Sequence, residues 1–535
     1  ADRDDLRMAM DCGQTGCFDR PSRVLTTLAS MRSAIQRLMA AGESLARRLE
    51  SFVWLPLVGC AILTWFSLAA SAARPFWFDE LFTFHLARLP DFATLWLALS
   101  KGVDLQPPLF HLTTAGAQKL FGSSEVATRL PGLAGYLLMT VCLYLFVRRR
   151  TSPLYGAVAA LFPAVTEAFR YSYEARPYGL MLGFSALALL CWQQAASAVT
   201  AVRRQLGLAG LFLSLALAVS FHYYSVLVFI PLAIGETFRW FSRRRPDIPM
   251  AIAAGLGGLA IVVYLPLIRG AVALHSDHPW NAVTLRFIYD AFHFALSPAA
   301  VPLALCLVAL YLLYWLGNGN RFAEAPGTSL TAAETGAALG FVLLPVFAYF
   351  LGRAVTHMMT ERYVLPLVIG FAVLVACALY HAAGGRAIAS LALAAILGGI
   401  FVGRHIARPD ASNPYATLTL PQQDRDLPLV VASGLDFVPQ LYYGNADVRS
   451  RIVCVDLATH YRGVDAVERN ILTAAPFFHW PAMRYVEFAR KHSRFFLLST
   501  PAVNWIAANL HKDGARLDFA ASQNENTLYL VTTDR

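Results

Sequence analysis

The sequence carries little charge for its length. Of its 535 residues, 15% are Asp, Glu, Lys or Arg and 57% are hydrophobic, and the mean hydropathy is +0.50. A soluble domain has far more charge, about 25% of its residues, so this shortage excludes an ordinary soluble enzyme. Apolar runs recur through the first three quarters of the chain. Many approach the ~20 residues that a helix needs to cross a bilayer, which predicts a polytopic membrane protein.

Other familiar patterns are missing. The eight cysteines show no spacing typical of a metal site or a disulfide framework. The C-terminal tail has no glycine-rich phosphate loop, which argues against a dinucleotide cofactor. Acidic residues are outnumbered, 34 against 44 basic ones, for a net charge of +10. Because the arginines gather in short loops between apolar runs, they indicate membrane topology and not nucleic acid binding.

The arginine-rich loops give each apolar run a direction. Positive loops stay in the cytoplasm, which places Arg47 and the loops ending at Arg150, Arg204 and Arg245 on that side. Eleven spans follow, at 52–72, 130–147, 155–169, 178–198, 206–220, 225–241, 250–268, 298–316, 332–351, 363–380 and 387–402. Ala- and Arg-rich usage suggests a bacterium. We therefore predict a multi-pass protein of the bacterial inner (plasma) membrane with a cytoplasmic N-terminus.

Three regions are expected. Residues 1–50 form a cytoplasmic N-terminal tail, residues 51–405 form the transmembrane domain, and residues 406–535 form a small periplasmic α/β domain. The α/β prediction rests on short Val-, Leu- and Phe-rich runs that alternate with helical stretches. Within the second region, the outer loop at 74–128 contains apolar runs too short to cross the membrane, which suits interfacial helices.

Ionisable and aromatic residues collect on the predicted outer face. Asp79 and Glu80 stand side by side in an aromatic loop directly after the first span. Other outer loops contribute Glu174, Arg176, Tyr178, His222, Tyr223, Arg362 and Tyr363. Ionisable groups at membrane depth are costly and are functional candidates by default. Because arginine binds phosphate and a carboxylate accepts a proton from a hydroxyl, the set suits transfer of a sugar from a lipid phosphate to an alcohol.

Six motifs, spread in order over most of residues 50–405, carry a resemblance to a known family. They are W-F-D-E-L at 77–81, Q-P-P-L at 106–109, E-V-A-T-R-L-P at 125–131, S-Y-E-A-R-P-Y at 172–178, F-H-Y-Y at 221–224 and E-R-Y-V-L-P at 361–366. Together they resemble the GT-C membrane glycosyltransferases of the family-39-like group. That group includes the protein O-mannosyltransferases and the bacterial lipid A aminoarabinose transferase.

The resemblance implies a fold and a reaction. The fold is an all-α polytopic GT-C domain of about eleven transmembrane helices, followed by a small extramembrane α/β domain. The reaction is an inverting sugar transfer from a polyprenyl-phosphate donor, among membrane lipids, to a hydroxyl of a glycan, lipid or protein acceptor. No cofactor is expected, and the chemistry requires no metal, although a divalent metal remains possible.

The resemblance also implies residue roles. Asp79 takes the role of catalytic base, and Glu80 is a second catalytic residue that orients a substrate or supports Asp79. The implied substrate-binding residues are Glu174, Arg176, Tyr178, His222, Tyr223, Arg362, Tyr363 and Gln106. Gln106 is a departure, because some relatives have Lys before the Pro-Pro pair. That difference weakens any specific prediction of aminoarabinose transfer.

Structural alternatives stand beside these roles. Asp79 and Glu80 are also suited to cap an interfacial helix, Glu174 and Arg176 to form a structural ion pair, and Arg362 to anchor its span at the headgroups. His222 is also suited to a structural position at the membrane interface, with its hydrogen bonds made within the protein. Pro107-Pro108 is suited to begin a helix. His275, Asp277 and His278 form a loosely spaced candidate for a metal site. A membrane transporter or a flippase for lipid-linked glycans is the alternative function.

Overall fold

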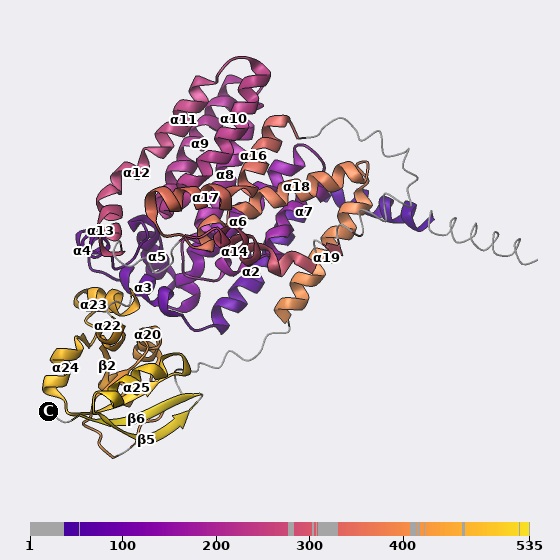
Figure 1. The fold of residues 1–535 in the computed structure, drawn as a ribbon. Helices are drawn as coiled ribbons and strands as arrows, with labels where there is room; N and C mark the ends of the chain where they lie inside the picture. The colour runs from indigo at the N-terminus through magenta and orange to yellow at the C-terminus, as the bar shows by residue number, and fades with distance from the viewer. Residues whose placement is uncertain are drawn as a thin grey trace, which may run out of the picture.

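The computed structural model describes residues 37–533, except 53, 276–282, 302–303, 306–307, 309–329, 407–414, 416–417, 422, 463–465 and 524. The chain is a multi-pass membrane protein built mainly of helices (Figure 1). Six helices in the described ranges are long and apolar enough to cross a membrane, or up to eight if each bent pair counts as one span. The prediction of eleven spans therefore stays a prediction.

Most predicted spans correspond to helices of the bundle. The unbroken ones are α2 (Leu55–Ala73), α6 (Glu125–Arg148), α8 (Tyr178–Ala196), α9 (Ala201–Phe221), α10 (Phe229–Arg243, preceded by the 3-10 turn η3, Tyr223–Val228), α18 (Leu367–Ala382) and α19 (Ala387–Ile406). Of these, α18 is shorter than a full span. Most of the predicted span at 298–316 lies outside the described residues.

Three predicted spans are broken by proline. The run at 155–169 ends its α-helix α7 (Pro153–Leu161) early and continues as the 3-10 turns η1 (Phe162–Val165) and η2 (Glu167–Ser172). The run at 250–268 divides into α11 (Ile248–Gly258), α12 (Ala260–Val263) and α13 (Leu265–His275), with a bend of 54°. The run at 332–351 divides into α16 (Ala332–Val342) and α17 (Leu344–Leu351), with a bend of 55°. Pro163, Pro266 and Pro345 stand at these breaks. Each interrupts its helix, because proline cannot donate the backbone hydrogen bond that continues a helix.

The loop after the first span forms three short helices, and its predicted place in the membrane interface stays a prediction. These are α3 (Phe78–Leu86), α4 (Phe92–Ser100) and α5 (Pro108–Phe121). Local chemistry begins each helix. Asp91 caps α4 by accepting from the Thr94 amide at 2.7 Å, and α5 starts at Pro108, where a missing amide proton costs nothing. In α3, the side chain of Glu80 accepts from the Trp77 amide at 3.3 Å, which ties the first turn to the residue before it.

Glycine lets α6 and α8 cross in close contact. A Cβ atom on Gly135 would lie 2.4 Å from the backbone of Gly179, and one on Gly179 would lie 2.2 Å from the Gly132 carbonyl oxygen. Small residues at such a crossing allow helix backbones to approach. The contact brings Arg129, in the first turns of α6, close to the segment 174–176 that leads into α8. The glycines thus help to build the site described below.

The six described strands of the tail form one mixed sheet, in the order β3-β2-β1-β4-β6-β5. They are β1 (Leu429–Val431), β2 (Ile452–Val455), β3 (Ala482–Met483), β4 (Arg494–Ser499), β5 (Arg516–Gln523) and β6 (Asn526–Thr532). The first four pair in parallel, while β6 runs antiparallel to β4 and β5. Four strands match the predicted runs, whereas β3 and β5 were not predicted.

Helices connect the strands and join the tail to the bundle. They are α20 (Gly434–Tyr443), α21 (Ala446–Arg451), α22 (Leu457–Arg462), α23 (Ala466–Phe478), α24 (Tyr485–Lys491), η7 (Pro501–Val503) and α25 (Asn504–Lys512). The remaining helical turns of the bundle are α14 (Arg286–Leu296), η4 (Ser297–Ala299), η5 (Gly352–Thr356) and η6 (Glu361–Val364). In Figure 1 the yellow tail lies at the α3 end of the bundle, opposite the turn that joins α10 to α11.

Candidate active site

Asp79 lies between two arginines. Its Oδ2 atom is 3.2 Å from Nη1 of Arg362 and 3.8 Å from Nη2 of Arg176. The aspartate comes from the first turn of α3, Arg176 from the segment before α8, and Arg362 from η6. The Asp79 side chain is 24% exposed. Both arginines contact the same carboxylate oxygen of Asp79.

A second carboxylate extends this row of charges. Asp104 Oδ2 lies 3.3 Å from Arg176 Nη1 and 3.6 Å from His111 Nε2. Arg176 is buried and also donates to the backbone carbonyl of Asp79 at 3.3 Å. The row therefore reads Asp104, Arg176, Asp79, Arg362, with alternating charge. Asp104 was not predicted, because nothing in a single sequence distinguishes it from an ordinary loop acid.

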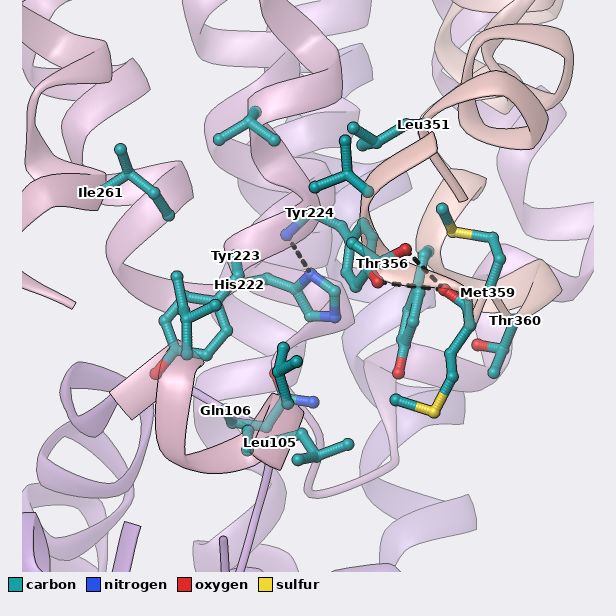
Figure 2. Close-up of a pocket in the computed structure, with 17 residues that line it drawn as sticks. Leu105, Gln106, His222, Tyr223, Tyr224, Ile261, Leu351, Thr356, Met359 and Thr360 are labelled. Carbon is teal, nitrogen blue, oxygen red and sulfur yellow. Dashed lines mark hydrogen bonds between the residues drawn. The ribbon is translucent and has the colours of Figure 1, made fainter. Parts of the chain in front are cut away.

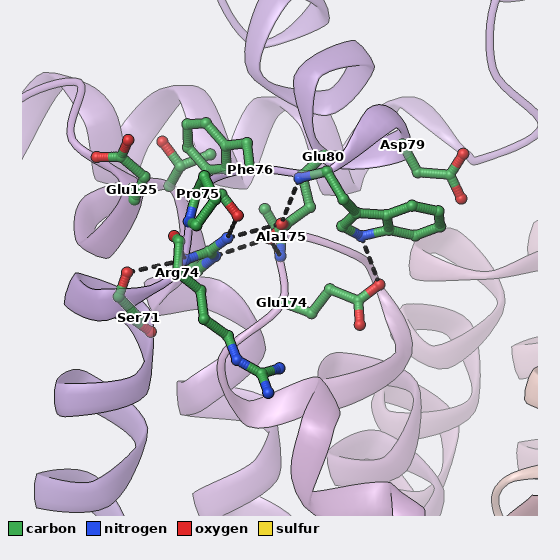
Figure 3. Close-up of polar contacts among 12 residues, drawn as sticks. Ser71, Arg74, Pro75, Phe76, Asp79, Glu80, Glu125, Glu174 and Ala175 are labelled. Carbon is green, nitrogen blue, oxygen red and sulfur yellow. Dashed lines mark hydrogen bonds and ion pairs between the residues drawn. The ribbon is translucent and has the colours of Figure 1, made fainter. Parts of the chain in front are cut away.

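Glu80 faces away from Asp79 and is fully engaged. Arg129 donates from Nε and Nη2 to its two oxygens, each at 2.7 Å, and the Ala175 amide donates to it at 2.6 Å. Glu80 is 1% exposed. Figure 3 shows Asp79 lying apart from this network. These contacts fit the expectation that Glu80 supports Asp79, and its side chain also takes part in capping α3, as the structural alternative proposed; its catalytic role stays a prediction.

Glu174 is buried next to the same loop. It accepts from Trp77 Nε1 and from Arg170 Nε, each at 2.9 Å. Its ion-pair partner is thus Arg170 and not Arg176, so the structural pair considered above is wrong in its partner. Burial raises the pKa of Glu174 to about 7, although Arg170 opposes the shift. Glu174 supports the Trp77 ring and does not line the cavity described next.

An apolar cavity of about 230 Å³ opens beside the charged row (Figure 2). Four of the predicted residues line it: Gln106, His222, Tyr223 and Tyr363. The other walls are mainly aliphatic and come from α12, α13, α17 and the turns around them. They are Leu105, Tyr224, Val226, Ile261, Ile268, Ala271, Val272, Leu351, Val355, Thr356, Met358, Met359 and Thr360.

The cavity contains hydrogen-bonding groups without protein partners. Among the described residues, Oε1 of Gln106 and Nε2 of His222 are buried and make no hydrogen bond. His222 Nδ1 accepts from the Tyr224 amide at 3.3 Å, so Nε2 carries the proton of the neutral ring. Burial, with Arg176 and Arg362 nearby, lowers the pKa of His222 to about 3, which keeps the ring neutral. The Oγ1 atom of Thr360, another lining residue, is also buried without a hydrogen bond among the described residues, so three groups can pair with a ligand, and the satisfied-histidine alternative is only half correct.

Tyr178 connects the cavity to the charged row. Its ring lies 5.2 Å from that of His222 and 6.5 Å from that of Tyr363, and the Arg362 guanidinium lies 6.0 Å from its centre. Arg362 is also the sequence neighbour of Tyr363, which lines the cavity. The apolar cavity and the Asp79 row are therefore adjacent parts of one site. Arg362 contacts Asp79, and its anchoring role at the headgroups stays an alternative.

No group of three or more potential metal ligands occurs within the described ranges. Asp277 and His278 of the loosely spaced candidate lie outside those ranges, as does the side chain of His275. Pro107-Pro108 begins α5, as the structural alternative proposed.

Comparison with known proteins places this site in context. The model of a family described as dolichyl-phosphate-mannose-protein mannosyltransferase matches residues 105–268. The predicted resemblance is confirmed. The matched part is less than a third of the chain, and it includes Gln106, Arg176 and His222 but neither Asp79 nor Arg362. No curated protein matches the sequence.

Solved structures give the fold. The crystal structure of ArnT from Cupriavidus metallidurans bound to undecaprenyl phosphate matches with a TM-score of 0.53 at 12% identity, covering 90% of this chain and 98% of that one. Its apo state matches with a TM-score of 0.49 at 11% identity, covering 90% and 97%. The Archaeoglobus fulgidus oligosaccharyltransferase complex with Zn and sulfate matches with a TM-score of 0.43 at 12% identity, covering 88% and 72%. The chain shares the fold of the first structure.

Proposed function

We propose that this protein is a membrane glycosyltransferase that moves a sugar from a polyprenyl-phosphate donor to an acceptor hydroxyl. The observation that carries the proposal is a partly exposed Asp79, held by two arginines beside an apolar cavity. The family match and the shared ArnT fold support it. The ArnT structure was solved with undecaprenyl phosphate, a lipid of the proposed donor class.

Each part of the site has one task in this reaction. The apolar cavity takes a stretch of several isoprene units of the lipid chain, more than a donor of one or two units can supply. Arg362 and Arg176 bind the phosphate through their planar donor groups and balance its charge. His222 Nε2 and Gln106 Oε1 supply the donor and acceptor that hold polar groups of the ligand near the cavity.

The chemical step is a single displacement. The acceptor oxygen attacks the anomeric carbon while Asp79 takes the hydroxyl proton. The bond from that carbon to the phosphate oxygen breaks, and its electron pair leaves with polyprenyl phosphate. Because attack and departure occur on opposite faces, the configuration inverts. A phosphate is already a good leaving group, so no metal is needed in this scheme.

The arginine-rich loops support the proposed location. Arg148–Arg150, Arg203–Arg204 and Arg243–Arg245 end or begin helices at the opposite end of the bundle from α3. The positive-inside rule makes that end cytoplasmic. The site and the tail domain then face the periplasm of a bacterial inner membrane. The acceptor is a glycan, a lipid or a protein that reaches that side.

The test compares wild type with Asp79→Asn in detergent. Purified protein receives a panel of polyprenyl-phosphate sugars, with membrane extract as acceptor source, and mass spectrometry follows release of polyprenyl phosphate. Loss of a general base lowers kcat by about 10²-fold or more. Donor binding should persist, because the substitution leaves both arginines in place. Asp426→Asn, which removes an exposed tail carboxylate, is the control. Full turnover by Asp79→Asn overturns the proposed base, and lipid movement without any covalent product favours the transporter.

A further inference from the structure

One hydroxyl of the tail domain hydrogen-bonds to two groups of the membrane domain. Tyr443, the last residue of α20, accepts from the backbone amide of Phe76 at 2.7 Å and donates to Glu125 Oε1 at 2.9 Å. A phenol has one proton to give, so these two directions follow from the chemistry of the partners. Phe76 lies three residues before Asp79, and Glu125 begins α6. A single side chain thus connects the tail, the catalytic loop and a transmembrane helix.

The loop at 74–76 has no regular structure of its own, because it lies between the end of α2 and the start of α3. Arg129 holds its carbonyl groups, donating to those of Arg74 at 2.8 Å and Pro75 at 3.1 Å. The same guanidinium lies 5.0 Å from the centre of the buried Phe76 ring. Arg129 therefore fixes the loop from one side, while Tyr443 holds the amide of Phe76.

A buried backbone amide needs an acceptor. Within the described residues, the acceptor of the Phe76 amide is the Tyr443 hydroxyl. Immediately after Phe76, the capping contacts of Trp77 with Glu80 begin α3 and set its first turn, which carries Asp79. These contacts link Phe76 to the turn that carries Asp79, which itself pairs with Arg362.

Ring contacts also join α3 to the tail. Phe82 lies 5.2 Å from Trp480, Phe84 lies 5.2 Å from Tyr442, and His85 lies 5.2 Å from Phe478, measured between ring centres. Such contacts bury apolar area and stabilise docking, but they tolerate sliding far better than a hydrogen bond does. Tyr443 is the group at this interface that fixes the register of the loop.

We infer that Tyr443 is a positioning residue of the active site, through which the docked tail domain sets the position of Asp79. The expected effect on kcat rests on the proposed function, whereas the expected effect on amide exchange does not. The tail is then a working part of the enzyme, and its removal is expected to misplace Asp79.

The neighbouring tyrosine is a matched control. Tyr442 lies on the same helix, and its ring contacts Phe76 at 6.1 Å and Phe84 at 5.2 Å. In the part of the chain that the structure describes, its hydroxyl makes no hydrogen bond. Tyr442→Phe and Tyr443→Phe therefore remove the same atom from adjacent positions, but only the second removes a contact to the loop.

The experiment measures amide exchange and transfer on the full-length protein in detergent. In Tyr443→Phe, exchange at Phe76 and at Leu81 is expected to rise, roughly tenfold at Phe76. With an active donor, kcat is expected to fall by about tenfold or more while the donor KM changes less. Tyr442→Phe should leave the exchange rates and kcat within about twofold of wild type. A twofold change is well below the effect expected from the loss of one hydrogen bond. Glu125→Ala, which removes the acceptor from the core side, should shift exchange in the same direction and serves if Tyr443→Phe does not fold.

An unchanged amide exchange rate at Phe76 in Tyr443→Phe overturns the inference. So does a faster exchange at Phe76 without any increase at Leu81. Faster exchange at both amides with an unaltered kcat also overturns it. If the wild type transfers no sugar from any donor, the proposed function fails, but the exchange result still decides whether Tyr443 holds the loop.

Discussion

Arg129 and Glu80 form a buried, two-pronged ion pair, with both nitrogen–oxygen distances at 2.7 Å. Each side chain is 2% exposed. The residues come from α6 and α3, and the pair joins the loop before Asp79 to the transmembrane bundle. Because the four adjacent hydrogen bonds go to backbone groups of residues 71, 74, 75 and 175, the pair shapes the chain around the active site.

Glu80→Gln is therefore expected to destabilise the fold. The substitution leaves the Arg129 charge buried without its partner, and breaking such a pair costs about 3–5 kcal/mol. Thermal unfolding in detergent should show a clearly lower midpoint than wild type. Asp79→Asn, at a partly exposed position, should unfold close to wild type. A Glu80→Gln protein with an unchanged midpoint but no activity would instead support the catalytic role first predicted for Glu80.

Arg362 is expected to act mainly on donor binding. Arg362→Gln removes a charged fork that would contact the phosphate, and a charged hydrogen bond is worth a loss of about 10–100-fold. We expect the KM for the polyprenyl donor to rise by that factor, measured by initial rates over a range of donor concentrations. Arg353→Gln removes an exposed arginine from the preceding turn η5 and should leave the KM nearly unchanged. Equal effects of the two substitutions would remove Arg362 from the phosphate site.

The sequence predicts which residues lie on the same side of the membrane better than it predicts which of them contact one another. Asp79, Arg176 and Arg362 could be placed on one face because apolar spans and arginine-rich loops give each loop a side. The partnership of Glu80 with Arg129 could not be predicted, because 49 residues separate them and no periodicity links them. Arg129 stood inside a recognised motif, but a motif does not show which way a side chain points.

Proline explains most of the difference in the fold. Pro163, Pro266 and Pro345 are visible in the apolar runs, yet hydropathy alone treats each run as one straight helix. The structure ends or bends a helix at each of them. Short strands raise a separate difficulty: β3 has two residues, and β5 contains Asp518, Ser522 and Gln523 instead of an apolar run. Neither resembles the buried strands that the sequence pattern detects.

Glu174 should make stability depend on pH. Its folded pKa of about 7 lies above the ordinary value of 4.5, so between these two pH values the folded state holds a proton that the unfolded state has lost. Stability from this group is therefore greatest below about pH 4.5 and falls as pH rises toward 7. The thermal midpoint of wild type should fall relative to Glu174→Gln between pH 5 and 7.5, a range set by this shift. Parallel midpoints across that range would contradict the assignment.

Asp247 is expected to stabilise the end of the bundle opposite the active site. It caps α11 by accepting from the Met250 amide at 3.3 Å, and it pairs with Arg204 Nη2 at 2.7 Å and with Arg239. Asp247→Asn leaves Arg239, which is 9% exposed, with Glu236 as its remaining charge partner at 2.8 Å, so a smaller loss of about 1.5 kcal/mol is expected from the weakened charged hydrogen bonds. A double-mutant cycle with Arg204→Ala, read by thermal unfolding, should show coupling. Because this network is remote from Asp79, the KM for donor should not change; a rise in KM would contradict that separation.

Filling the apolar cavity should discriminate between long and short lipids. Ala271 of α13 lines the cavity, and Ala271→Phe would occupy part of its roughly 230 Å³. A long polyprenyl donor then loses apolar contacts worth about 0.8 kcal/mol for each CH₂ group, so its KM should rise at least tenfold. A donor with a chain of one or two isoprene units buries less and should lose less. The control Val263→Phe adds a similar ring on α12 at a residue that is 62% exposed and does not line the cavity. If the KM rises equally for the long and the short donor, the cavity does not hold the lipid chain. The lipid chain must then lie along another groove of the bundle.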